Sequence, residues 1–216
     1  MNNDYEKIFC DVKEYLDKSG NNGSKLLNKF PFRRRSDHIY RVYIWVNRLL
    51  EKLQDTKIDK NALLLAALFH DIGYAISDNS KDHAENSVTL FEKYCIKIEL
   101  MLENNDFVKY LIMNHSKKEL MINKDTPIEL LILMEADLLD ETGALSIVWD
   151  CMAEGAQEIQ NFEKTYEHIK DKSCKILNTN PMITEPGKEI WRNKQKLVKV
   201  FSEQLYYDLY NQEIIK

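Results

Sequence analysis

The chain of 216 residues has few of the residues that interrupt regular structure, with six glycines and four prolines. Because glycine and proline mark turns, their scarcity, together with abundant Leu, Lys, Glu and Ile, indicates mostly helix. No segment alternates strictly between apolar and polar residues, so the sequence gives no support to a sheet. We therefore predict an all-α fold.

Paired cysteines and long apolar runs are also missing. The four cysteines form no C-x-x-C pair, which argues against a zinc ribbon and favours free thiols in a reducing compartment. The longest apolar run, residues 62–69, is too short to span a membrane. The N-terminus lacks the basic and apolar regions of a signal peptide. A cytoplasmic protein that does not bind membranes is expected.

Positive charge is not in excess, since 30 basic residues face 35 acidic ones and the net charge is −5. An acidic chain gives no support to stable nucleic-acid binding. The run Arg33-Arg34-Arg35 is interpreted as a solvated charged segment, with collection of phosphate at the mouth of a site as the alternative. The chain has neither G-x-x-x-x-G-K-S/T nor G-x-G-x-x-G, so kinase and dinucleotide-binding functions lack support.

The spacing of apolar residues predicts a series of helices and no clear linker. Their approximate ranges are 4–19, 36–53, 59–71, 84–95, 105–114, 127–140, 143–155, 157–177 and 186–210. In the last of these, the stripe Trp191, Leu197, Val200 and Phe201 is interpreted as core packing. A single domain over 1–216 is predicted, with core motifs in 36–140 and C-terminal helices 143–210 packed on it.

The dipeptide His70-Asp71 follows the apolar run 62–69, and Gly73 then ends the helix at what is expected to be a positive-φ position. A helix that is apolar all round is expected to be buried. An imidazole and a carboxylate at its end are costly unless they are paired or bind metal. A histidine that interacts with the helix dipole is the structural alternative.

Further residues of metal-binding type lie elsewhere in the chain. The candidate metal ligands are His38, His70, Asp71 and Asp137 for one ion, and His83 and His115 for a second ion or for positioning phosphate. Asp71 is placed to bridge two ions. A mixed His/Asp set favours a divalent transition metal, namely Mn, Fe, Co, Ni or Zn, with one or two per chain. His168 is interpreted as an ordinary helix residue.

The local contexts of these residues carry a resemblance to a known family. Residues 38–42, His-Ile-Tyr-Arg-Val, resemble an H-x-x-R-V motif, and residues 68–73, Leu-Phe-His-Asp-Ile-Gly, resemble L-x-H-D-I-G. Residues 83–87 resemble H-x-x-x-S, and residues 135–140 resemble D-A-D-x-L-D, with Glu135 in place of the first Asp. Over roughly residues 30–205, this ordered set resembles a small bacterial subgroup of the HD-domain metal-dependent phosphohydrolase superfamily.

The resemblance implies an all-helical HD-type bundle whose metal is bound by the four residues of the first ligand set. It also implies hydrolysis of a phosphoester or phosphoanhydride of a small phosphorylated metabolite, with a nucleotide as the expected class, by a metal-activated hydroxide. The predicted catalytic residues are Asp71, Arg41 and Glu85. For Arg41 a structural salt bridge stays open, and for Glu85 an exposed helix charge. Tyr74 stands where some members have a phosphate-reaching lysine.

Two alternative functions remain at this point. One is a non-catalytic HD module that binds a nucleotide as a sensor. The other is a di-iron HD oxygenase, which uses a similar ligand set for oxygen chemistry. Oligomerisation is left open.

Overall fold

A computed structural model of the protein describes residues 3–20, 33–53, 57–77, 79–99 and 103–210. These residues form helices and connecting turns with no strand among them, which confirms the all-α prediction. None of the described helices is both long and apolar enough to cross a membrane. The chain divides into two compact units, Met1–Asp137 and Leu138–Lys216, and the single domain over 1–216 stays a prediction.

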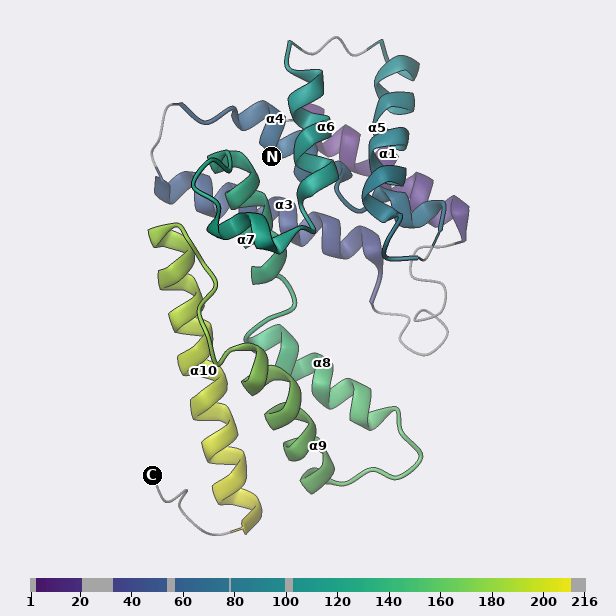
Figure 1. Ribbon diagram of the computed structural model, residues 1–216. Helices are drawn as coiled ribbons and strands as arrows, with labels where there is room; N and C mark the ends of the chain where they lie inside the picture. Colours follow the sequence, from purple (N-terminus) through teal and green to yellow (C-terminus); the bar gives the residue numbers. More distant parts are fainter. Residues whose placement is uncertain (1–2, 21–32, 54–56, 78, 100–102, 211–216) are drawn as a thin grey trace. The chain divides into compact units, whose positions relative to one another are not determined.

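The first unit contains most of the helices (Figure 1). They are α1 (Asn3–Ser19), α3 (Arg35–Leu53), α4 (Lys60–Phe69), α5 (His83–Lys97), α6 (Asn105–Asn114) and α7 (Ile128–Leu139), the last of which ends just beyond the unit. Two short 3₁₀ turns, η1 (Ile72–Ala75) and η2 (Lys118–Ile122), were not predicted. Each of them follows one of the candidate ligand histidines.

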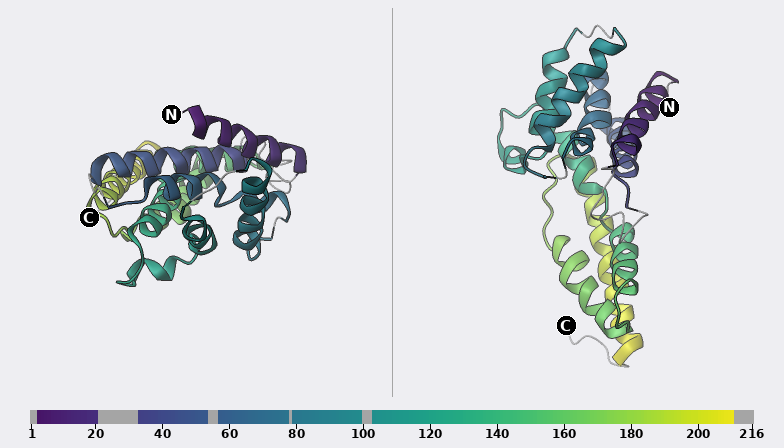
Figure 2. Two further views of the ribbon diagram at one scale, coloured as in Figure 1. Left: turned by 90° about the horizontal axis from the view of Figure 1, so that it is seen from above. Right: turned by 90° about the vertical axis from the view of Figure 1, so that its right-hand side faces the viewer.

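Helix α4 forms the centre of the first unit, in contact with α1, α3, α5 and α6. Asp59 begins it by accepting a hydrogen bond from the Ala62 amide at 3.0 Å, as expected of a helix cap. All of its apolar side chains except that of Leu64 are buried, and α1 lies alongside α3 on this unit (Figure 2). Because burial of the apolar run drives this arrangement, the residues that follow α4 are carried into the interior.

The second unit contains α8 (Ala144–Gly155), α9 (Phe162–Ile169), the π-helical turn η3 (Lys170–Cys174) and α10 (Glu185–Tyr210). The predicted helix 157–177 begins later than expected. Asn161 caps α9 by accepting a hydrogen bond from the Lys164 amide at 2.7 Å. A cap at this position fixes the start of the helix, so residues 157–161 are a connection.

The predicted apolar stripe of α10 is wrong in part. Trp191 is buried, but Leu197, Val200 and Phe201 are exposed. The buried residues of the helix beyond Trp191 are Val198 and Ser202, seven and eleven positions on. Helical periodicity places these on one side and the three exposed residues on another.

Candidate metal centre

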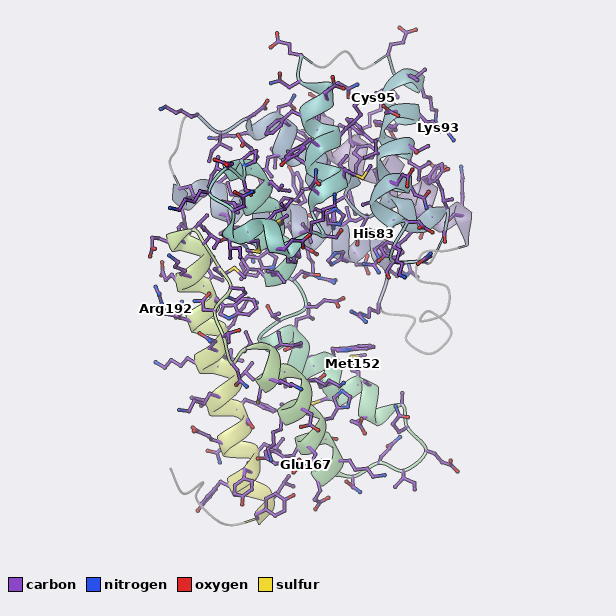
Figure 3. The ribbon with its side chains drawn as sticks, in the orientation of Figure 1. His83, Lys93, Cys95, Met152, Glu167 and Arg192 are labelled. Atoms are coloured by element: carbon purple, nitrogen blue, oxygen red, sulfur yellow. The ribbon has the colours of Figure 1, made fainter. Side chains whose placement is uncertain are left out.

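Six candidate ligands meet in the first unit because they lie at or near the ends of helices that pack together. His38 lies in the first turn of α3, His70 and Asp71 follow α4, His83 begins α5, His115 follows α6, and Asp137 lies on α7. All are buried except Asp137, whose side chain is 22% exposed. Figure 3 shows His83 at one end of α5, with Lys93 and Cys95 toward the other end.

One group of donors forms around His38. Its Nε2 atom lies 3.3 Å from Nε2 of His70 and 3.4 Å from Oδ2 of Asp71. The same atom lies 3.3 Å from Oδ1 of Asp137. His38, His70 and Asp71 therefore lie close enough together to share one metal ion, and Asp137 adds a fourth donor in contact with His38.

A second group forms around the other oxygen of Asp71. The Nε2 atoms of His83 and His115 lie 3.2 Å apart. Oδ1 of Asp71 lies 3.5 Å from the first of these atoms and 3.4 Å from the second. The two oxygens of Asp71 thus face two different donor groups, the arrangement required of a bridging ligand.

The hydrogen bonds of the imidazoles fix which nitrogen faces the centre. His70, His83 and His115 each have Nδ1 against the backbone carbonyl three residues earlier. A carbonyl only accepts, so Nδ1 carries the proton and Nε2 presents a lone pair. Two such lone pairs 3.2 Å apart, on His83 and His115, can both be satisfied by one cation between them.

The protonation states also fit a metal. Burial lowers the pKa of His70 to about 3 and also lowers the pKa of His83. Both imidazoles are therefore neutral at neutral pH. Burial raises the pKa of Asp71, but His70 and Arg35 outweigh it and hold the pKa well below its ordinary value. Neutral imidazoles and ionised carboxylates are the forms that bind a divalent ion.

Gly73 and Ser87 fix the two halves of the centre to each other. Gly73 does not have the positive φ that was expected. It is needed because a β-carbon there would lie 2.0 Å from the carbonyl oxygen of His83. The Ser87 hydroxyl accepts from the Gly73 amide and donates to the His70 carbonyl, both at 2.8 Å. This contact explains the H-x-x-x-S spacing.

Arg35 belongs to the site, and the interpretation of the arginine run as solvated is wrong for this residue. Its Nη1 donates to Oδ2 of Asp71 at 2.7 Å. Its guanidinium carbon lies 4.0 Å from the ring centroid of Tyr74, which stacks in turn on His83 at 4.9 Å. The spacing of Arg35 and His38, three residues apart on one helix, was the signal that could have indicated this.

Lys118 was missed by the sequence reasoning. Its Nζ lies 2.6 Å from Oδ2 of Asp137. Burial raises the pKa of Asp137, but Lys118 and His38 outweigh it and hold the pKa well below its ordinary value. Lys118 lies in η2, and the direction of a side chain on a turn this short cannot be obtained from apolar spacing.

Arg41, Glu85 and His168 are the other residues that the sequence singled out. Arg41 is half-buried one turn after His38, and Glu85 is exposed in the first turn of α5, so their catalytic roles stay predictions. His168 lies in the second unit between Asp150 and Glu154, with contacts of 3.3 and 2.7 Å.

Fold and site together define an all-helical protein with a His/Asp cluster that can hold metal. Residues 35–142, half of the chain, match the family model of the HD domain. The chain belongs to the HD domain family. Curated protein sequences contain no significant match.

Solved structures share the fold. An HD-superfamily hydrolase from Bacillus thuringiensis is 19% identical, with a TM-score of 0.63, covering 94% of this chain and 98% of its own. The Lin1889 protein from Listeria innocua is 26% identical, with a TM-score of 0.60, covering 99% of this chain and 100% of its own. Bacillus subtilis YpgQ in complex with ADP is 22% identical, with a TM-score of 0.56, covering 81% of this chain and 89% of its own.

Proposed function

We propose that this protein is a metal-dependent phosphohydrolase that cleaves a phosphoester or phosphoanhydride of a small metabolite, with a nucleotide as the expected class. The observation that carries the proposal is Asp71, whose two oxygens face two separate groups of metal donors. Paired sites of this kind are common in enzymes that act on phosphate. Membership of the HD domain family supports the same class.

The proposed ligands divide between two ions. His38, His70, Asp71 and Asp137 would hold the first, and His83, His115 and the other oxygen of Asp71 the second. When bound, such ions supply Lewis acidity, which makes water more acidic and neutralises negative charge on a phosphoryl group. The carbonyl partners of the histidines keep Nε2 aimed at the ions.

The cationic side chains at the centre favour a phosphorylated substrate. Arg35 is held against Asp71 by its contact with the Tyr74 ring, with 28% of its side chain exposed. A guanidinium in this position suits a phosphoryl oxygen. Arg41 is proposed as a second phosphate contact and Glu85 as a proton carrier. The ADP complex of Bacillus subtilis YpgQ supports a nucleotide as the substrate class.

Release of phosphate from a nucleotide panel tests the proposal, with Mn, Fe, Co, Ni, Zn or Mg added. We expect selective release by the wild-type protein and a loss of at least about 100-fold in Asp71→Ala, since both donor groups lose a ligand. Asp125→Ala, which changes an exposed aspartate of a turn, is the matched control and should retain activity. Full activity and metal content in Asp71→Ala would contradict the proposal.

The alternatives give different results in the same assay. A nucleotide sensor binds nucleotides tightly without turnover under any metal. A di-iron oxygenase requires iron and consumes oxygen. We propose a cytoplasmic location because four cysteines without a disulfide suit a reducing compartment.

A further inference from the structure

The ammonium group of Lys118 is held in place by three acceptors. Its Nζ donates to Oδ2 of Asp137 at 2.6 Å, to the His115 carbonyl at 3.1 Å and to the Met134 carbonyl at 3.4 Å. An ammonium has three protons, so these contacts account for all of them. Lys118 therefore ties the end of α6 to α7 and has a fixed position beside one carboxylate oxygen.

The two oxygens of Asp137 are consequently not equivalent. Oδ1 lies 3.3 Å from Nε2 of His38 and faces the first donor group. Oδ2 is the oxygen that Lys118 contacts. A divalent ion bound through both oxygens would lie next to the ammonium, where two positive charges repel each other strongly. An ion bound through Oδ1 alone lies farther from this charge.

The exposed fractions place this pair at an open part of the centre. The Lys118 side chain is 32% exposed and that of Asp137 is 22% exposed, whereas those of Asp71 and His70 are 6% and 0% exposed. Water or a substrate oxygen can therefore reach the ion on the side of Asp137. A second carboxylate oxygen would compete for that coordination position.

We propose that Lys118 is a positioning residue that restricts Asp137 to coordination through Oδ1 and so keeps a position on the first metal ion open for water or a phosphoryl oxygen. The inference rests on the proposed metal-dependent function. Lys118 would then determine how many protein oxygens coordinate the ion, whatever it contributes to the stability of the fold.

The test uses Mn²⁺ alone and needs no substrate. Titration of metal-free protein followed by water-proton relaxation gives both the affinity for Mn²⁺ and the number of exchangeable waters on the bound ion. Lys118→Met is expected to bind Mn²⁺ at least as tightly as wild type and to lose about one exchangeable water per chain, because Asp137 then uses both oxygens. Lys118→Arg, which keeps the charge, should retain the water.

Lys117→Met is the matched control. Lys117 is exposed immediately before η2 and contacts the Asn114 side chain at 2.9 Å, so its loss should change neither quantity. If Lys118→Met does not fold by circular dichroism, Lys118→Gln replaces it, since the amide keeps a hydrogen bond but removes the charge.

The outcomes separate this inference from the proposed function. An unchanged water number in the uncharged Lys118 variant would overturn the role of Lys118 while the metal site stands. Weaker Mn²⁺ binding with the water retained would also overturn this role, because Lys118 would then only hold Asp137 in place as a ligand. Absence of Mn²⁺ binding by the wild-type protein would contradict the proposed function itself.

Discussion

Gly73 and His83 are in direct backbone contact, so close that a β-carbon on Gly73 would lie 2.0 Å from the carbonyl oxygen of His83. Through this contact, the start of α5 packs against the turn that follows Asp71. It brings the first histidine of the second donor group to the carboxylate that both groups share. The geometry of the centre therefore depends on the absence of one side chain.

Replacement of Gly73 by alanine is expected to separate the two donor groups. The new methyl group must displace backbone of α5, at a cost of about 1–3 kcal/mol in the free energy of unfolding. The protein should then retain roughly half its bound metal by elemental analysis, because the second group is the one displaced. Gly155→Ala is the control, since a β-carbon there meets nothing within 4 Å. Wild-type metal content in Gly73→Ala would contradict the account.

Ser87→Ala is expected to weaken the same junction by a different route. The hydroxyl is buried and satisfies both the Gly73 amide and the His70 carbonyl. Its removal leaves two buried polar groups without this partner, which costs about 1–3 kcal/mol in urea denaturation. Thr89→Ala, on the same helix, removes only a hydrogen bond to the Glu85 carbonyl and should cost less than about 0.5 kcal/mol. Equal effects of the two variants would contradict the assignment.

Arg35→Lys is expected to lower kcat/KM for the substrate found in the panel by about 10- to 100-fold. Lysine retains the charge but lacks the planar group that contacts the Tyr74 ring and Asp71 together. Arg34→Lys, at an exposed neighbouring position, is the control and should behave as wild type. If the two variants had the same kinetics, Arg35 would have no specific role in the centre.

Asp150 of the second unit should make stability depend on pH. Burial raises the pKa of Asp150 above its ordinary value of 3.8, although Ser173 and His168 oppose this. A raised pKa in the folded state means that its stabilising effect is present below pH 3.8 and is lost as the pH rises through the folded-state pKa. Asp150→Asn removes this titration. Its free energy of unfolding minus that of wild type should therefore increase from pH 3.8 toward neutral.

Urea denaturation of both proteins across this pH range measures the difference. A difference that stays constant with pH, or that decreases as the pH rises, would show that burial does not disfavour the ionised form of the Asp150 carboxyl group.

The sequence was sufficient to predict where the candidate ligands lie on the helices. His70 and Asp71 follow an apolar run whose burial is dictated by its composition, and His38 and Asp137 lie on amphipathic or apolar helices of clear period. Apolar periodicity determines which helices are buried, and so which helix ends can meet. The all-α fold could be predicted for that reason, whereas the set of six candidate ligands depended on the residue types and on the resemblance of their motifs to the HD-domain family.

Contacts that depend on turns could not be obtained in this way. Lys118 reaches Asp137 from a 3₁₀ turn, and Gly73 is required for a close approach between segments rather than for its own φ. Both depend on tertiary packing, which local propensity does not specify. The exposed Phe201 shows the same limit, because an apolar residue on a helix does not reveal how many neighbours the helix has.

The metal content of the purified protein tests the central claim most directly. Elemental analysis of wild type, His83→Ala and His115→Ala, after equilibration with Mn²⁺, should give about two ions per chain in wild type and about one in either variant. His168→Ala, which changes the histidine of the second unit, should match wild type. A wild-type protein that holds one ion or none under these conditions would contradict the claim that Asp71 joins two metal sites.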